Sequence, residues 1–131
     1  MNKFILMLIG YFIGSVTFAY ISGKIFGKLD IRNYGSGNAG ATNAFRVLGS
    51  KAGGFAFLGD FAKGFIDVKI GIYFLGLTGG IITGLFAVIG HCYPIFLKFK
   101  GGKGVATTAG LIFAVNPLIG IILFIILVTI I

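Results

Sequence analysis

The chain has 131 residues, 57% of them hydrophobic and only 11% charged, and it carries a net charge of +8. A soluble domain has about 25% charged residues, so this composition excludes a water-soluble globule. The length allows one domain, residues 1–131. The positive charge favours anionic partners, but the 15 Phe lie mostly in uncharged runs, which disfavours a surface for nucleic-acid bases.

The first predicted element is a membrane-spanning helix over residues 4–23, which contain no charged side chain. Twenty residues at about 1.5 Å each cover the hydrocarbon core of a bilayer, which is about 30 Å thick. The segment lacks a small-residue cleavage site, so we expect a retained helix and not a signal peptide. Gly10 and Gly14 share one face of this helix, a spacing that allows another helix to approach closely.

A polar stretch follows over residues 24–52 and carries five Lys or Arg residues. Small residues and asparagine dominate its centre, residues 34–43, where apolar periodicity fails, so we predict a structured loop. Thr42 suits the N-cap of a helix that restarts there. The pattern leaves open whether residues 44–60 lie in the membrane interface or already begin the second membrane helix.

The second apolar segment, residues 53–75, contains four ionisable side chains: Asp60, Lys63, Asp67 and Lys69. The first three recur at helical spacing and share one face, whereas Lys69 points to the opposite side. Ionisable groups in an apolar helix usually face the interior of a bundle. Two interpretations stay open: Lys63 is satisfied by both carboxylates and holds this helix against the loops, or the face takes part in function.

Residues 70–97 contain no Asp, Lys or Arg, and the Gly-Leu-Thr-Gly-Gly run at 76–80 predicts a tight turn between two helices. A second basic loop follows at 98–104, and residues 104–131 are again uncharged. Pro117 interrupts this last segment, because proline removes a backbone donor, so it forms either one kinked helix or a short helix followed by a returning one. Since the sequence ends within an apolar run, we expect the chain to be incomplete at its C-terminus.

These elements predict an all-α polytopic membrane protein with four to five transmembrane helical segments joined by Gly-rich cytoplasmic loops. If the first three helices each cross once, both basic loops lie on one side of the membrane. The first loop has five Lys or Arg residues and the second has three, whereas the turn at 76–80 has none. By the positive-inside rule the loops are cytoplasmic and the N-terminus is outside.

The first loop has the residue types of an anion site. Gly35, Gly37 and Gly40 fit the dinucleotide pattern G-x-G-x-x-G, but that pattern requires a strand–helix–strand unit, and membrane helices flank it here. The glycines instead allow backbone N–H groups to form a concave nest around an anion. Arg46 adds a forked cationic donor that suits phosphate. Neutral donors are supplied by Ser36, Asn38, Thr42 and Asn43. The alternative is a Gly-rich turn with capping polar residues.

The second loop has a similar composition. Gly101, Gly102 and Gly104 free the backbone, and Lys103 among them offers a point charge to a substrate. The loop is not a P-loop, because glycine follows the lysine where that motif needs Ser or Thr. The two preceding lysines, at positions 98 and 100, are interpreted as ordinary anchors in a lipid headgroup layer.

Near the second loop lies the only histidine, His91, followed by the only cysteine, Cys92. One cysteine excludes an intrachain disulfide, and one histidine cannot build a metal site, so no metal is predicted. No Asp follows His91 at the spacing of a His/Asp acyltransferase dyad, so a packing or hydrogen-bonding role is favoured for it. Cys92 has no evident activating base and receives no role.

At these residues the sequence resembles the bacterial acyl-phosphate-dependent glycerol-3-phosphate acyltransferases. The run from Gly35 to Arg46, GSGNAGATNAFR, is similar to the first motif of that family. The run from Gly90 to Thr107, which contains GHCYPIF and FKGGKGVAT, is similar to the second. The segment DFAKG at 60–64 also fits the family pattern, and the resemblance extends over essentially the whole chain.

The resemblance implies an enzyme of the bacterial inner membrane that acts in phospholipid biosynthesis. Such enzymes transfer a fatty acyl group from acyl phosphate to the 1-hydroxyl of glycerol 3-phosphate and form lysophosphatidic acid. The resemblance implies no cofactor, no direct use of acyl-CoA or acyl carrier protein, and a functional link to an enzyme that produces acyl phosphate. The family also has a third motif toward the C-terminus, with His, Asn and Glu residues, and this sequence stops before it.

The resemblance and the residue chemistry combine into one hypothesis for the site. Ser36 hydrogen-bonds the reacting centre, Arg46 with the first loop holds one phosphate, and Lys103 holds the other, so these three are the candidate catalytic residues. The remaining phosphate-binding candidates are Gly37, Asn38, Gly40, Thr42, Asn43, Gly101, Gly102 and Gly104, and the supporting candidates are Asp60, Lys63 and His91. Two rival functions stay open: a non-catalytic membrane protein that binds phosphate or lipid headgroups, and an anion transporter.

Overall fold

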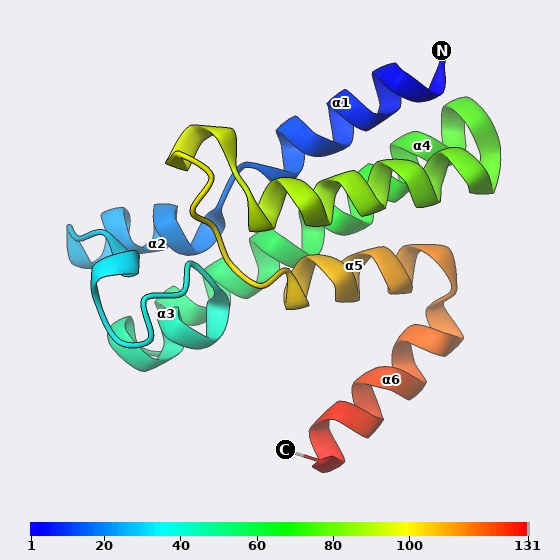
Figure 1. Ribbon diagram of the computed structural model, residues 1–131. Coiled ribbons are helices and arrows are strands. Elements are labelled where there is room, and N and C mark those ends of the chain that lie inside the picture. Colours follow the sequence, from blue (N-terminus) through cyan, green and yellow to red (C-terminus); the bar gives the residue numbers. More distant parts are fainter. Residues whose placement is uncertain (131) are drawn as a thin grey trace.

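A computed structural model describes residues 1–130, which form helices and loops without a β-strand, so Ile131 lies outside the described residues. In chain order the elements are α1 (Lys3–Gly14), α2 (Phe18–Gly27), the short 3-10 helix η1 (Ile31–Asn33), α3 (Ala41–Leu48), α4 (Ser50–Cys92), the short 3-10 helix η2 (Ile95–Leu97), α5 (Val105–Val115) and α6 (Pro117–Ile130). Figure 1 shows α1, α4 and α5 side by side, with α2, α3 and the long loops gathered at one end. Two segments are long and apolar enough to span a membrane, Lys3–Gly27 and Ser50–Leu97.

The long helix α4 is a hairpin of two limbs. It is broken at Leu75 and Gly76, and the φ of 66° at Gly76 is a left-handed conformation that glycine adopts readily. The turn predicted at 76–80 is therefore confirmed, although the break occupies only two residues. The two limbs touch through glycine backbone, because a Cβ atom at Gly71 would collide with the carbonyl of Gly79.

Helix α1 runs along the second limb of α4 over two glycines. A Cβ atom at Gly10 would collide with the carbonyl of Thr83, and one at Gly14 with the carbonyl of Ala87. This confirms that the Gly10 and Gly14 face accepts a second helix at close range. Helix α5 meets the first limb of α4 in the same way, through Gly64.

The expectation of one unbroken helix over residues 4–23 is wrong, because the chain leaves helical geometry between α1 and α2. The peptide groups freed at the break are bound by the first limb of α4. Lys63 Nζ donates to the carbonyl of Val16 at 2.7 Å, and the backbone N–H of Phe18 donates to Asp60 Oδ1 at 3.3 Å. These partners lie 47 and 42 residues away in the chain, so the local sequence gives no sign of the break.

The helix predicted to restart near Thr42 begins one residue earlier, at Ala41, with Gly40 as its N-cap. Residues 44–60 are helical throughout except at one bend. They contain the end of α3 and the start of α4, separated by Gly49 with a φ of 93°. The second membrane helix therefore starts directly after this bend.

The segment after the second loop is a hairpin and not one kinked helix. Asn116 separates α5 from α6, and its side-chain oxygen accepts hydrogen bonds from the backbone N–H groups of Leu118 and Ile119 at 3.1 and 3.2 Å. Such a cap starts a new helix. Helix α6 turns back along α5, where a Cβ atom at Gly120 would press against the ring of Phe113, and Figure 1 shows the two helices as a V.

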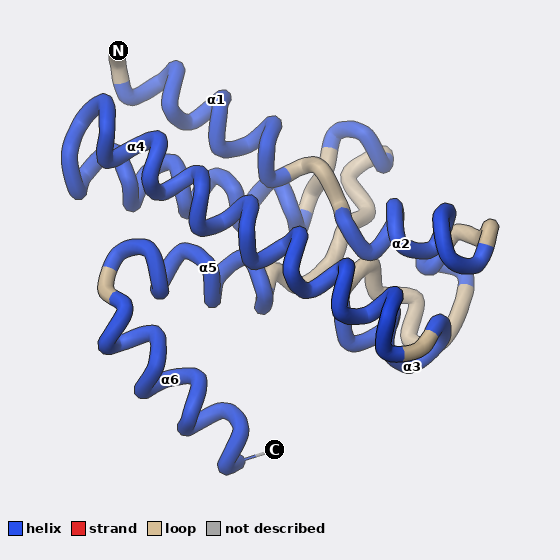
Figure 2. Tube along the Cα trace, turned by 180° about the vertical axis from the view of Figure 1, so that it is seen from behind, coloured by secondary structure: helices blue, strands red, loops and turns tan. Residues whose placement is uncertain are grey.

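Both basic loops lie at the same end of the bundle. Figure 2, seen from behind, shows the loop segments around α2 and α3, with the N-terminus and the bend of α4 at the opposite end. Arg32 in the first loop ties the two loops together by donating to the carbonyls of Leu97 and Lys100 at 2.9 and 3.3 Å. The predicted juxtaposition of the loops is confirmed, and the side of the membrane that they face stays a prediction.

Candidate active site

The first loop is folded around one buried side chain, Asn43. Its amide oxygen accepts a hydrogen bond from the backbone N–H of Ser36 at 3.0 Å, and its amide nitrogen donates to the carbonyl of Asn38 at 3.1 Å, among others. Gly35 and Gly37 adopt φ values of 55° and 78°, which turn the backbone around this amide. Asn43 thus shapes the loop. Its predicted contact with phosphate stays a prediction, with its amide already engaged inside the loop.

The second loop passes directly against the first. The backbone N–H of Gly101 donates to the carbonyl of Cys92 at 3.3 Å, and that of Gly102 donates to the carbonyl of His91 at 3.2 Å. A Cβ atom at Gly102 would also press against the backbone of Ala39 in the first loop. The N–H groups of these two glycines therefore cap the end of α4, and the phosphate contact predicted for the glycines stays a prediction.

Between the two loops lies a cavity of about 510 Å³, within the range of about 300–1,000 Å³ typical of small-molecule sites. All three candidate catalytic residues line it: Ser36, Arg46 and Lys103. It is also lined by seven other predicted residues: Asn38, Gly40, Thr42, Asn43, Asp60, His91 and Gly104. Gly37, Gly101, Gly102 and Lys63 do not line it. The sequence prediction therefore converges on one place.

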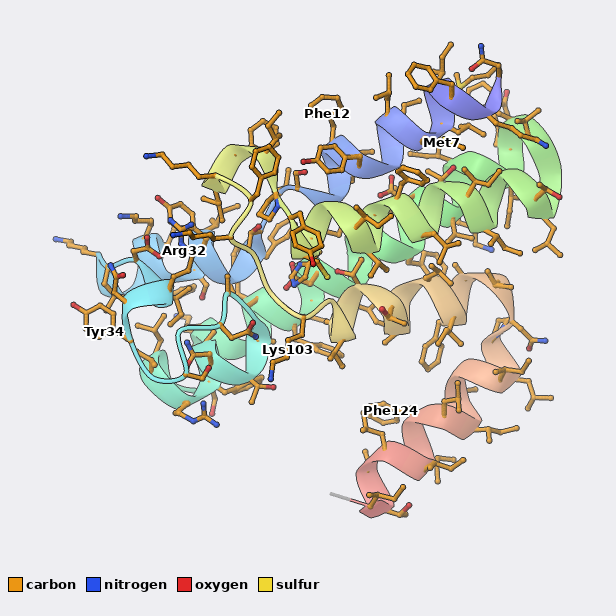
Figure 3. The ribbon with its side chains drawn as sticks, viewed as in Figure 1. Met7, Phe12, Arg32, Tyr34, Lys103 and Phe124 are labelled. Carbon is orange, nitrogen blue, oxygen red and sulfur yellow. The ribbon has the colours of Figure 1, made fainter. Side chains whose placement is uncertain are left out.

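The cavity presents positive charge and free backbone donors. Helices α3 and α5 both begin at its wall, and their N-cap residues, Gly40 and Gly104, contribute no side-chain hydrogen bond. The first N–H groups of a helix lack acceptors within it and carry partial positive charge, so each helix start can bind an anion. Arg46 and Lys103 add full charges, and neither forms an ion pair with any described residue. Figure 3 shows Lys103 beside α3 and the start of α5.

Beneath the cavity, three ionisable side chains form a buried network. Lys63 Nζ lies 3.0 Å from Asp60 Oδ1 and 2.9 Å from His91 Nδ1, and it also donates to the carbonyl of Val16. Each of the three side chains is at most 3% exposed. The hydrogen-bonding role predicted for His91 is confirmed, and the network joins both limbs of α4 to the break between α1 and α2.

Asp67 is also buried, as its position on the face of Asp60 and Lys63 predicted, and Lys69 is exposed on the opposite side. Of the two interpretations left open, the one in which both carboxylates satisfy Lys63 holds for Asp60 and is wrong for Asp67. Lys63 pairs with Asp60 alone, and neither oxygen of Asp67 has a hydrogen-bond partner among the described residues. Within those residues, no three His, Cys, Asp or Glu side chains come together as metal ligands.

Arg32, for which the sequence predicts no role, lies at the junction of the two loops. Its guanidinium pairs with Asp30 at 2.8 Å and reaches the carbonyl of Leu97. The hydrogen bond from Arg32 lowers the pKa of Asp30, because it stabilises the charged carboxylate. The local signal was only an acidic and a basic residue two positions apart, while the acceptor carbonyl lies 65 residues away.

Comparison with known proteins gives a consistent family. A family model for glycerol-3-phosphate acyltransferase matches residues 4–131. The glycerol-3-phosphate acyltransferase of Thermoanaerobacter pseudethanolicus is 54% identical over 124 residues, which cover 95% of this chain and 63% of that protein. The enzyme of the same name from Staphylococcus haemolyticus is 50% identical over 131 residues, which cover 93% of this chain and 65% of that protein. The chain thus spans less than two thirds of the length of these relatives.

Solved structures agree with the sequence matches. The crystal structure of PlsY (YgiH), an integral membrane glycerol 3-phosphate acyltransferase, in its glycerol 3-phosphate form has a TM-score of 0.91 and 45% identity, and covers 98% of this chain and 64% of the PlsY chain. The lysophosphatidic acid form has a TM-score of 0.84 and 43% identity, and covers 94% of this chain and 61% of the other. The predicted all-α polytopic membrane fold is confirmed, and the chain belongs to the glycerol-3-phosphate acyltransferase family.

Proposed function

We propose that the protein transfers a fatty acyl group from acyl phosphate to the 1-hydroxyl of sn-glycerol 3-phosphate and forms lysophosphatidic acid. The observation that carries the proposal is one cavity lined by Ser36, Arg46 and Lys103 and by the starts of two helices. Such a cavity suits a reaction in which both substrates carry phosphate. The solved relatives support this acceptor and product, since one is a glycerol 3-phosphate form and the other a lysophosphatidic acid form.

In this reaction the hydroxyl oxygen attacks the acyl carbon, the bond from that carbon to the phosphate oxygen breaks, and the hydroxyl proton ends on the released phosphate. Acyl phosphate is already activated, so the main tasks of the protein are positioning and charge stabilisation. Arg46 and the start of α3 bind one phosphate, and Lys103 and the start of α5 bind the other. Ser36 hydrogen-bonds the reacting centre.

An apolar groove between α5 and α6 offers a place for the acyl chain. Its volume is about 230 Å³, and its lining includes Phe113 and Phe124, the latter inside the V of the two helices in Figure 3. Val105 and Leu127 line both the groove and the cavity, so the groove leads to the proposed phosphate sites. We place the acyl chain in this groove with its activated end in the cavity.

The positive-inside rule then orients the molecule in the bacterial inner membrane. The two loops carry five and three Lys or Arg residues, while the bend of α4 carries none. We propose that the loops and the cavity face the cytoplasm, where glycerol 3-phosphate is available, and that the N-terminus is outside.

The test is an assay of purified protein in lipid vesicles with glycerol 3-phosphate and either acyl phosphate or acyl-CoA. We expect lysophosphatidic acid to form from glycerol 3-phosphate when acyl phosphate is the acyl donor, and not when acyl-CoA is the donor. Arg46→Ala and Lys103→Ala should each lower turnover by about a hundredfold or more, because each removes charge stabilisation in a site shielded from water. Lys51→Ala, at an exposed lysine that does not line the cavity, is the matched control and should have little effect.

The assay is run on this chain and on a full-length relative with the matching substitutions, since the chain spans 63% to 65% of the relatives' length. Near-normal turnover in Arg46→Ala or Lys103→Ala, or product formed from acyl-CoA alone, would overturn the proposal. Glycerol 3-phosphate binding without product in either protein would favour a non-catalytic headgroup-binding protein.

A further inference from the structure

The ammonium group of Lys63 has three N–H donors and three close neighbours. Its Nζ lies 2.7 Å from the carbonyl of Val16, 3.0 Å from Asp60 Oδ1 and 2.9 Å from His91 Nδ1. An ammonium group donates hydrogen bonds and cannot accept them. Because this side chain is only 3% exposed, each of its N–H groups is assigned to one of these three acceptors.

With Lys63 charged beside the carboxylate of Asp60, this arrangement assigns the tautomer of His91. Its Nδ1 accepts a hydrogen bond from Lys63 and therefore carries no proton, so the proton of the neutral ring is on Nε2. Asp60 is the competing partner, since a protonated Nδ1 would donate to its carboxylate. However, Asp60 Oδ1 lies 3.6 Å from Nδ1, which is too long for a hydrogen bond, and it already accepts from Lys63 and from the backbone N–H of Phe18.

The Nε2 atom of the same ring lies against Gly102 in the second loop, and the ring itself lines the cavity. A Cβ atom at Gly102 would collide with Nε2, and one at Gly104 would lie 3.9 Å from the adjacent Cδ2 atom. His91 and Lys103 both line the cavity. The hydrogen bonds of His91 within the described residues involve Nδ1 and not Nε2, so the Nε2–H group is available to a ligand.

We propose that His91 donates a hydrogen bond from Nε2–H to a substrate oxygen in the cavity, as a neutral ring whose tautomer is set by Lys63. The inference rests on the proposed function, because its acceptor is a phosphate oxygen or the oxyanion formed at the acyl carbon. A fixed donor aimed at an oxygen that gains negative charge stabilises that charge. His91 is then no general base, because Lys63 occupies its bare nitrogen and its other nitrogen already carries the proton. Lys63 is the positioning residue.

The chain allows a direct test because His91 is its only histidine. ¹⁵N-histidine labelling of the 131-residue chain in detergent micelles gives NMR signals from this ring alone. At neutral pH we expect a protonated Nε2 and a bare Nδ1. A proton on Nδ1, in either the other tautomer or the imidazolium, overturns the proposal and leaves the proposed function intact. Lys63→Met should give a mixture of tautomers, and an unchanged tautomer would show that Lys63 does not set it.

Ligand titration tests the donor itself. Glycerol 3-phosphate and inorganic phosphate should each shift the Nε2 signal, and the shift should vanish in Arg46→Ala and Lys103→Ala. An Nε2 signal that stays fixed while binding persists and still depends on Arg46 and Lys103 overturns the inference but not the proposed function. Binding that is insensitive to both of these substitutions counts against the proposed function instead.

Two substitutions separate the two ring nitrogens. His91→Asn keeps an acceptor near the position of Nδ1 and removes the donor toward the cavity, whereas His91→Gln keeps an amide N–H near the position of Nε2. In the full-length relative we expect the asparagine variant to lower kcat/KM by about ten- to a hundredfold, as for a lost hydrogen bond to a charged group. The glutamine variant should retain clearly more activity. Equal losses in both variants, or no loss in the asparagine variant, would contradict the proposal.

Discussion

Replacement of Lys63 by methionine is the sharpest test of the buried network. Methionine has a similar length without the charge, so the carboxylate of Asp60, 1% exposed, loses its cation and the carbonyl of Val16 loses its donor. Removal of one partner from a buried ion pair costs about 3–5 kcal/mol. The carbonyl of Val16 is partly buried, and the loss of its donor adds to this cost by at most about 1–3 kcal/mol. We therefore expect Lys63→Met to lower the free energy of unfolding by about 4 kcal/mol or more.

Reversible unfolding in mixed detergent micelles measures this loss. Lys51→Met, at an exposed lysine in the first turn of the same limb, is the matched control and should change the free energy of unfolding by less than about 0.5 kcal/mol.

The double variant Asp60→Asn/Lys63→Met tests the cause. It removes the unpaired charge at position 60, and the amide oxygen of the new asparagine can still accept from the backbone N–H of Phe18. We expect it to recover a large part of the stability lost in the single variant, because two contacting residues do not act additively. If the single variant unfolds like the unaltered protein, or the double variant is no more stable than the single one, the ion pair does not carry this energy.

Gly14→Ile forces a side chain into the carbonyl of Ala87 on the facing helix and should lower Tm markedly. In contrast, Gly54→Ala, where nothing lies within 4 Å of the added Cβ atom, should raise the free energy of unfolding by about 0.5–1 kcal/mol. Equal effects of the two substitutions would refute the close helix contact. Asn43→Ala removes the amide around which the first loop folds and should speed hydrogen exchange there while the membrane helices stay protected. Arg32→Ala removes the bonds between the two loops, so limited proteolysis should cut both loops faster, and an unchanged pattern would contradict this. Since Arg32 holds the pKa of Asp30 below its ordinary 3.8, the carboxylate stabilises the first loop above that value and loses this contribution as pH falls through the lower folded-state pKa. Hydrogen exchange in the loop, corrected for its intrinsic rate, should therefore rise at acid pH in the unaltered protein but not in Asp30→Asn.

Local composition was sufficient to find the residues of the candidate site. A lysine between glycines and an arginine just after a Gly-rich run are unusual in so apolar a chain, and these patterns led to Lys103 and Arg46, which line one cavity. The same reasoning selected Gly101 and Gly102, whose N–H groups donate to the carbonyls at the end of α4, and their contact with phosphate stays a prediction. Glycine is needed there because the backbone of one loop passes against another segment, and a sequence shows the glycine without showing which neighbour requires it.

Features that depend on distant partners could not be predicted. The break between α1 and α2 contains no proline or glycine at positions 15–17, and it is stabilised by Asp60 and Lys63 in another helix. Arg32 looked like one more basic loop residue, because its acceptor carbonyls belong to the second loop. In both cases the hydrogen-bond partner is brought near only by the fold.

The position of Lys63 explains why the fold and the site depend on the same side chain. Lys63 lies twelve residues before the break at Leu75, about 18 Å along the helix, and therefore well inside an apolar segment. Irregular backbone at such a depth is tolerated only where other groups of the protein satisfy it. Lys63 binds the free carbonyl at the break between α1 and α2 and, through the same ammonium group, holds the ring of His91 at the cavity. A substitution of Lys63 therefore changes backbone stability and cavity geometry together, whereas substitutions of Arg46, Lys103 or His91 act on the cavity without removing the partner of that carbonyl.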